Sequence, residues 1–456
     1  MTGWQMSGEL SSGGTPTRVD LVIAHAAEVL TCRPVSGRGV RGAALGRPER
    51  IADGALAIDG GRIMTVGASA EVLARFAGRE VLDATGKLVT PGFVDTHTHL
   101  VHEGSRHEEW GHKVLGTAPG TLAGGIEHTA RTTGAAGFRR LREGALARLD
   151  TMLAHGTTTA EAKSGYGLTP ASERRILEVT AALDHPVDLV GTFLGAHVPP
   201  EGTPRGRHLD GVVAQLAEVR HLAEYCDVTC DPAGFTPAEC ERIARAAREH
   251  GYGLRVHADQ TGYGGGAEMA IEAGAASVDH LEHVSDRAIG MFADSGTAAT
   301  LLPGVTYHLM DMVPGPRGGS WSDARHPRLA ERYRRLIDSG ALVVLATDYN
   351  PGSSPTLSMQ AVMQLAARLY RLGYGEAWHM STINAAVSLG RDADIGSLET
   401  GKRADAVVWN VPSHEMVVNR FGANLVSSVI KDGVVARGGA RRPVTVAGRT
   451  DAEARA

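Results

Sequence analysis

Between Pro91 and about Gly396, short β-branched runs alternate with longer amphipathic segments, and no other feature constrains the fold of this chain as much. The runs, in chain order, are FVDTHTH, GTTTAEAKSGYG, DLVGTFLGAHVPP, DVTCDPAGF, LRVHADQ, SVDHLEHV, TAATLLPG and LVVLATDYNPGS. Helical segments such as GFRRLREGALARLDTMLAHG lie between them, and most end in glycine, as helices commonly do. Eight successive strand–helix units predict an α/β fold, a (β/α)8 TIM-type barrel whose site lies at the carboxyl ends of its strands.

Shorter strand patterns stand at both ends of the chain. VDLVIAHAAEVLTC, GALAIDGGRIMTVG and EVLDATGKLVTPG precede the barrel, and Gly60-Gly61 between two alternating runs is a hairpin signal. GSLETGKRADAVVWNV and LVSSVIKDGVVARGG follow the barrel. Neither end has enough strands for a stable sheet of its own. We therefore expect residues 19–88 and 397–440 to form one small composite β-sandwich domain beside a barrel of residues 89–396.

The chain ends and the overall composition narrow the class of protein. Residues 1–18 are expected to be a disordered leader and residues 441–456 a mobile tail. The 456 residues are 43% hydrophobic with a net charge of -5, which lacks the basic excess typical of binding to nucleic acid or anionic lipid. No apolar run approaches the ~20 residues of a membrane span, and no secretory signal is visible. Four cysteines without a Cys-x-x-Cys pair favour free thiols in a reducing cytoplasm.

Polar residues gather at the carboxyl ends of the predicted barrel strands. His97 and His99, two residues apart at the end of a strand, are expected to project from the same face. One such pair could equally be a polar strand end, but His257, His280 and Asp348 occupy matching positions on later strands. Imidazole nitrogens and a carboxylate make a suitable ligand set for a divalent metal such as zinc or iron. The joint placement therefore favours a metal site over a purely structural cluster.

The same stretches resemble a known family. The strings DTHTHLVHEGSR, HGTTTAEAKSGYGL, FLGAHVPP, HADQ, DHLE and ATDYNPGSSPT resemble the metal-dependent amidohydrolase superfamily and, within it, the imidazolonepropionase family. The resemblance implies metal-dependent opening of a cyclic amide, imidazolone propionate, to N-formimino-L-glutamate in histidine degradation. It also implies metal ligands and substrate-binding residues. The ligands would be His97, His99, His257 and Asp348, and the substrate-binding residues Arg106, Tyr166, His197 and Asn350.

The resemblance also suggests roles within the reaction. Asp348 would take a proton from the attacking water and pass it to the departing ring nitrogen. His280 would hydrogen-bond the developing oxyanion, and Gln260 would orient substrate or water. Asp95, on the face of the two strand-end histidines, would support an imidazole. The fourth strand lacks the lysine that bridges two metals in binuclear relatives, and Lys163 lies on the second strand, so one metal is expected.

Departures from the family pattern leave alternatives open. His102 and Glu103 precede Arg106 where the family pattern differs, and Glu103 could neutralise Arg106. The alternatives are a paralogue acting on another cyclic amide, a deaminase of a nitrogen heterocycle, and a catalytically inactive barrel used as a scaffold. Gln260 stands where such deaminases typically carry a glutamate, which argues against the deaminase. The intact ligand set argues against the inactive scaffold. A small-molecule substrate and a homodimeric partner are expected.

Overall fold

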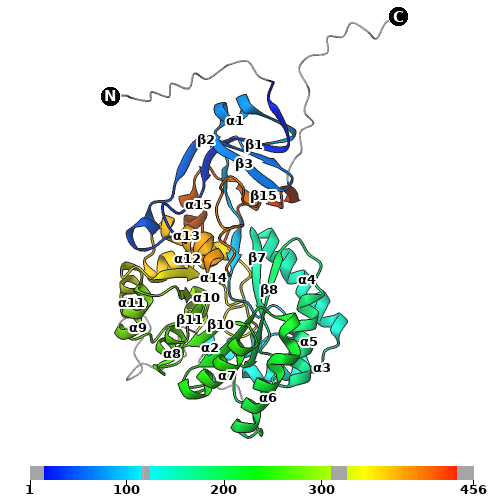
Figure 1. Cartoon of the computed structure of the whole chain (residues 1–456), viewed down its shortest axis with the longest axis vertical. Coiled ribbons are helices and arrows are strands. Elements are labelled where there is room, and N and C mark those ends of the chain that lie inside the picture. Colours follow the sequence, from blue (N-terminus) through cyan, green and yellow to red (C-terminus); the bar gives the residue numbers. More distant parts are fainter. Residues whose placement is uncertain (1–14, 116, 118–123, 310–325, 439–456) are drawn as a thin grey trace, which may run out of the picture.

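The predicted barrel is present as a parallel sheet of eight strands (Figure 1). The computed structural model describes residues 15–115, 117, 124–309 and 326–438. Each barrel strand pairs with the next in chain order, and an isolated bridge between Thr98 and Tyr349 brings the first and last strands together. The strands are β6 (Phe93–Asp95), β7 (Thr157–Lys163), β8 (Asp188–Ala196), β9 (Tyr225–Cys230), β10 (Gly253–Ala258), β11 (Ser277–His280), β12 (Ala298–Leu301) and β13 (Leu342–Leu345).

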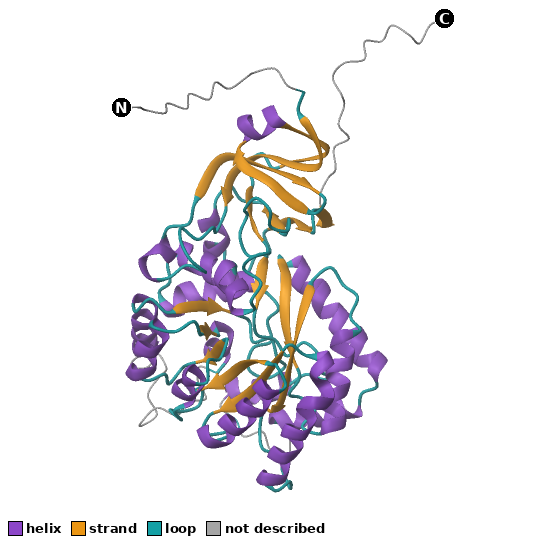
Figure 2. Cartoon of the chain, viewed as in Figure 1, coloured by secondary structure: helices purple, strands orange, loops and turns teal. Residues whose placement is uncertain are grey.

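Helices follow every barrel strand and surround the sheet (Figure 2). They are α2 (His107–Leu115), α3 (Gly125–Ala135), α4 (Phe138–Ala154), α5 (Pro170–Ala181), α6 (Arg205–Val219), α7 (Pro237–Glu249), α8 (Gly266–Glu272), α9 (Asp286–Ala293), α10 (Pro303–His308), α11 (His326–Asp338), α12 (Met359–Tyr370), α13 (Tyr374–Ser381) and α14 (Ile383–Ser388). None of the described helices combines the length and the apolar character that crossing a bilayer requires.

The local sequence sets the ends and the buried face of these helices, as α7 illustrates. The Thr236 hydroxyl accepts a hydrogen bond from the Glu239 N–H at 3.4 Å, and the Glu239 carboxylate accepts one from the Thr236 N–H at 2.8 Å. Pro237 fills the first helical position, where its missing N–H has no helical partner to lose. The buried positions recur at helical spacing, so this face packs on β9 and β10. They are Cys240, Ile243, Ala244 and Ala247.

A second sheet of eight strands uses both ends of the chain, as predicted. Its order is β16-β15-β14-β5-β1-β2-β3, with β4 paired to β1, so β5 lies between an N-terminal and a C-terminal strand. Gly60 and Gly61 form the β2–β3 turn, both in left-handed backbone. The strands are β1 (Thr17–Leu30), β2 (Arg50–Asp59), β3 (Arg62–Ala68), β4 (Phe76–Asp83), β5 (Leu88–Pro91), β14 (Ala406–Trp409), β15 (Val426–Lys431) and β16 (Val434–Gly438), with helices α1 (Ser69–Arg75) and α15 (His414–Asn419).

Aromatic side chains connect the two sheets. Phe93 of β6 stacks on Trp378 of α13 with ring centroids 5.3 Å apart, and meets Trp409 of β14 edge-on at 5.5 Å. The expected domain boundaries at residues 88/89 and 396/397 stay a prediction. The leader expected over residues 1–18 overlaps β1, which begins at Thr17, while residues 1–14 and the tail lie outside the described residues.

Candidate active site

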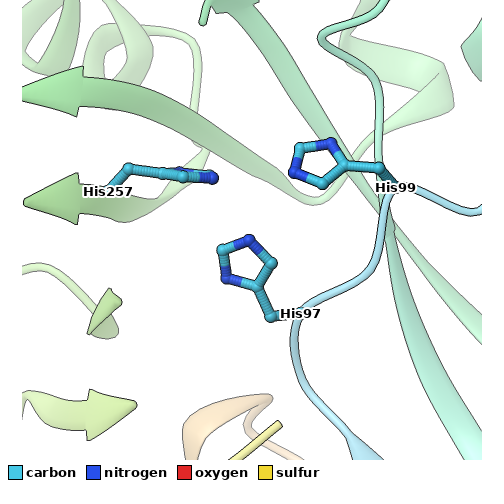
Figure 3. Close-up of side chains that lie close together, drawn as sticks. All are labelled: His97, His99 and His257. Carbon is cyan, nitrogen blue, oxygen red and sulfur yellow. The ribbon is translucent and has the colours of Figure 1, made fainter. Parts of the chain in front are cut away.

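Three imidazoles converge at the carboxyl end of the barrel (Figure 3). His97 and His99 extend from the segment after β6, and His257 extends from β10. A nitrogen of each ring lies within 4.8 Å of the others, as a shared metal ion requires. The prediction that His97 and His99 end a strand is wrong, because β6 already ends at Asp95, and Thr98 forms only an isolated bridge with Tyr349 in the segment after β13. The two rings nevertheless face one space.

In each of the three imidazoles, Nδ1 contacts an acceptor that fixes the orientation of the ring. A ring that donates from Nδ1 presents the lone pair of Nε2 to a metal. The Nε2 atoms of His97 and His257 have no hydrogen-bond partner among the described residues. Burial lowers the pKa of His97 and of His99, which favours the neutral form that binds metals. The Nδ1 contacts join His97 to Asp279 Oδ2 (2.7 Å), His257 to Asp227 Oδ1 (3.0 Å) and His99 to the Ser164 carbonyl (3.2 Å).

Asp348 adds a carboxylate to the three nitrogens. Its Oδ1 lies 3.3 Å from His97 Nε2 and 3.6 Å from His99 Nε2, and it has no hydrogen-bond donor among the described residues. The residue follows β13 in left-handed backbone with φ 47°, a strained conformation that clusters at functional sites. Burial raises the pKa of Asp348, so its charged form needs a cation nearby. The donor set therefore fits a divalent metal.

His280 lies beside this cluster. It is the last residue of β11, with φ 82°, and a nitrogen of its ring is within 4.8 Å of ligand atoms of His97 and Asp348. Its Nδ1 has no hydrogen-bond partner among the described residues, and the Glu282 carboxylate is 3.9 Å away. Burial raises the pKa of Glu282 to about 8. Glu282 stands in the DHLE string, where no role was predicted for it.

The carboxylates that support the imidazoles differ from the expected one. Asp95 was expected to support an imidazole, but its oxygens accept hydrogen bonds from the Thr347 N–H (3.1 Å) and hydroxyl (2.6 Å). Asp279 and Asp227 support His97 and His257 instead. Both aspartates stand in the quoted strand runs, one directly before His280 and one opening the fourth run, so an acidic residue inside an apolar strand was the available signal.

One cavity of about 380 Å³ brings the predicted site residues together. All of them line it except His97, which is fully buried. Lys113, Thr229 and Asp231 also line it and were not predicted as site residues. The predicted residues in the lining are His99, His257, Asp348, His280, Gln260, Arg106, Tyr166, His197 and Asn350.

Arg106 reaches this cavity with its guanidinium held in a fixed position. Its Nε and one terminal nitrogen donate to the two carboxylate oxygens of Glu109, each at 2.8 Å. The possibility that Glu103 neutralises Arg106 is wrong, because Glu103 accepts two hydrogen bonds from Arg140, each at 3.1 Å. A side chain at Gly352 would collide with the guanidinium, so the Arg106 side chain packs directly on that backbone.

Tyr166 and His197 are held by a loop that turns around one buried carboxylate. Glu173 accepts hydrogen bonds from the N–H groups of Gly165, Gly167 and Leu168, at 2.6, 2.6 and 2.7 Å. The Gly165 carbonyl in turn lies 2.9 Å from His197 Nδ1. Burial lowers the pKa of His197 to about 4 and raises that of Tyr166. Both side chains therefore enter the cavity uncharged at neutral pH.

Asn350 and Gln260 line the cavity from two turns. The Asn350 amide donates to the Asp348 carbonyl at 2.7 Å and accepts from the N–H of Gly352 and of Ser353. These bonds use its hydrogen-bonding groups within its own loop, so a direct substrate contact stays a prediction. Gln260 follows β10, and its N–H donates to Asp231 at 2.8 Å.

Comparison with known proteins identifies the family. The profile of the amidohydrolase family matches residues 88–436. The chain is 42% identical over 403 residues to an imidazolonepropionase of Geobacillus kaustophilus strain HTA426, covering 84% of this chain and 90% of that protein. It is 40% identical over 440 residues to one of Symbiobacterium thermophilum, covering 93% and 99%. Its fold is similar to that of an adenosine deaminase from Xanthomonas campestris with bound zinc, with TM-score 0.65, 17% identity and coverage of 93% and 94%. The chain therefore belongs to the amidohydrolase family and, within it, to the imidazolonepropionase family.

Proposed function

We propose that this chain uses one divalent metal, zinc or iron, to hydrolyse imidazolone propionate to N-formimino-L-glutamate in histidine degradation. The observation that carries the proposal is that Arg106 lines the same cavity as the metal-ligand cluster. A small heterocycle with an acidic arm can then place its carboxylate at the guanidinium and its ring at the cluster. Identity of 40–42% to imidazolonepropionases over most of the chain supports this substrate.

Each residue of the proposed site has its own role in the reaction. The predicted ligands, His97, His99, His257 and Asp348, would hold the metal, which when bound activates water and polarises a carbonyl oxygen. Asp348 accepts a proton from the attacking water at its carboxylate and delivers it to the departing ring nitrogen. His280 donates a hydrogen bond to the oxyanion that develops on the ring carbonyl. Gln260 orients water or substrate.

Substrate contacts come from the other side of the cavity. Glu109 takes two of the three guanidinium nitrogens of Arg106 and leaves one terminal nitrogen free. Arg106 binds the propionate carboxylate through this free nitrogen alone or through two parallel hydrogen bonds. Tyr166 and His197 flank the ring, and Asn350 is the remaining proposed contact. We also propose that the chain forms a homodimer and is located in the cytoplasm. Light scattering on the purified chain tests the dimer.

The test of the activity is incubation with imidazolone propionate. Loss of the ring absorbance with formation of N-formimino-L-glutamate is the expected result, and metal-stripped protein is the control. Ammonia release would instead support the alternative, an aminohydrolase acting on another nitrogen heterocycle. Turnover of other cyclic amides with no turnover of imidazolone propionate would support a paralogue.

A further inference from the structure

Lys163 is fully buried at the end of β7, surrounded by carboxylates. Its Nζ lies 2.7 Å from Asp227 Oδ2, 2.8 Å from Glu161 Oε1 and 3.6 Å from Asp279 Oδ2, and all four side chains are 0% exposed. Lys163 is not among the residues that line the 380 Å³ cavity. The ammonium therefore lies behind the site, out of reach of a substrate.

Two of these carboxylates are the ones that fix metal-ligand imidazoles. Asp227 uses Oδ2 for Lys163 and Oδ1 for His257 Nδ1, at 2.7 and 3.0 Å. Asp279 Oδ2 accepts from His97 Nδ1 at 2.7 Å and faces Lys163 at 3.6 Å. One ammonium thus lies at the centre of a continuous chain of contacts that begins at one ligand ring and ends at the other.

Among the described residues, no other side-chain cation comes as close to Asp227. Arg255 is also buried, but its Nη2 is 3.9 Å from Asp279 and its Nε is 3.7 Å from Glu161. Its hydrogen bonds go to the Thr96 carbonyl and to the carbonyl and hydroxyl of Ser388. Buried carboxylates without a cation repel each other and turn toward other donors. Removing Lys163 would therefore release the acceptors that hold both rings with Nε2 toward the metal.

We propose that Lys163 is a positioning residue for the metal: by holding Asp227 and Asp279 in place, it aligns the imidazoles of His257 and His97 without itself being a ligand. The inference rests on the metal site of the proposed function and not on the identity of the substrate. It predicts that Lys163 determines how tightly the metal binds, while the stoichiometry of one metal per chain does not depend on it.

The test measures zinc affinity and not activity. Lys163→Met removes the ammonium, and Lys163→Gln removes the charge but keeps a donor, in case the first variant folds poorly. Each metal-stripped variant is titrated with Zn²⁺ against a chromogenic chelator, after urea denaturation has established its folded fraction. The Kd should rise about 10- to 100-fold, with one zinc still bound per chain at saturation.

Lys431 offers a matched control. It is also buried, at 5% exposure, and its Nζ lies 3.1 Å from Asp405. Lys431 belongs to the second sheet, far from the imidazoles proposed as metal ligands. Lys431→Met should lower the free energy of unfolding and leave the zinc Kd unchanged. Equal zinc Kd values for Lys163→Met, Lys163→Gln and the wild-type chain would overturn the inference, because Lys163 would then only stabilise the fold.

A double-variant cycle separates positioning from general damage. Asp227→Asn breaks the same chain of contacts at the next link, so Lys163→Gln combined with Asp227→Asn should bind zinc no more weakly than the weaker single variant. Additive losses would overturn the inference. A wild-type chain that binds no divalent metal would overturn the proposed function as well, whereas wild-type affinity in both Lys163 variants overturns the inference alone.

Discussion

The Asp348 carboxylate lies against the Nε2 atoms of His97 and His99, at 3.3 and 3.6 Å, where it can be both a ligand and a proton acceptor. Asp348→Asn keeps the shape and one oxygen but removes the basic group. We expect kcat to fall at least ~100-fold. Steady-state kinetics on imidazolone propionate measure the rate, and elemental analysis of the same sample reports the metal. A metal-loaded variant with near-normal kcat would assign the proton transfer to another group.

Arg106 is the residue that should distinguish acidic from neutral substrates. Arg106→Lys and Arg106→Ala should each lower kcat/KM for imidazolone propionate about 30- to 150-fold, the equivalent of roughly 2–3 kcal/mol for a charge-assisted pair. On an imidazolone ring without the carboxylate arm, both variants should match the wild-type chain.

Arg140→Ala is the matched control for Arg106. Its guanidinium pairs with Glu103 outside the cavity, so neither substrate should be affected. Equal losses on acidic and neutral substrates in the Arg106 variants would mean that Arg106 only holds its loop, and the assigned substrate would lose its main support.

At the scale of one element, the loop between β7 and α5 depends on Glu173. Its carboxylate accepts three backbone N–H groups around Tyr166, and charge-assisted bonds of this kind contribute roughly 1.5–3 kcal/mol each. Glu173→Gln should therefore loosen the loop and raise KM about 10-fold or more, with the metal content unchanged. Glu178→Gln, at an exposed position of the same helix, is the control. A Glu173→Gln variant that loses its metal but keeps KM would contradict this assignment.

At the scale of the whole molecule, Glu28 links the two ends of the chain. Its carboxylate on β1 accepts hydrogen bonds from Arg50 of β2 and lies 2.7 Å from Nδ1 of His414 on α15. Burial alone would raise the pKa of Glu28, but His414 and Arg50 together lower it below the ordinary value of 4.5. The stabilisation is therefore complete above about pH 4.5 and is lost as the pH falls through the lower pKa of the folded state.

Glu28→Gln tests this link. The variant should lose roughly 1.5–3 kcal/mol of unfolding free energy at pH 7, and its difference from the wild-type chain should shrink in strong acid. Urea denaturation across pH measures both values. Glu71→Gln, at an exposed position of α1, should show neither effect. A deficit that grows toward low pH would contradict the lowered pKa.

The parts of this molecule that repeat along the chain could be predicted from the sequence. Alternation and helix ends predicted all eight barrel strands. The gathering of polar residues at the carboxyl ends of those strands singled out all five residues proposed for the metal and the oxyanion, which are His97, His99, His257, His280 and Asp348. Pairs between distant strands could not be predicted in the same way. Asp279 supports His97 and Glu109 holds Arg106 because of where side chains point in space, and periodicity carries no information on that.

His97 and His99 illustrate the limit within one segment. The sequence pattern continues as a strand through both histidines, but the regular β6–β7 ladder ends at Asp95. Beyond it only single backbone hydrogen bonds remain on the two sides, from the Lys163 N–H to the Thr98 carbonyl at 2.9 Å and from the His99 N–H to the Tyr349 carbonyl at 2.8 Å. How far the regular ladder extends at this point is decided by the closure of the barrel. It is a property of the whole sheet, which no local window of sequence contains.

Because Gly352 has no side chain, the Arg106 guanidinium has room beside the backbone, and the size of residue 352 thereby affects which substrates the cavity binds. The Arg106 guanidinium occupies the space of a Cβ at that position, in the loop that also carries Asp348. A single methyl group, introduced by Gly352→Ala, would displace the guanidinium from Glu109 without altering any charge or any predicted metal ligand. An engineer who wishes to redirect this cavity toward uncharged rings could therefore begin with the backbone beneath the arginine and leave the arginine itself in place.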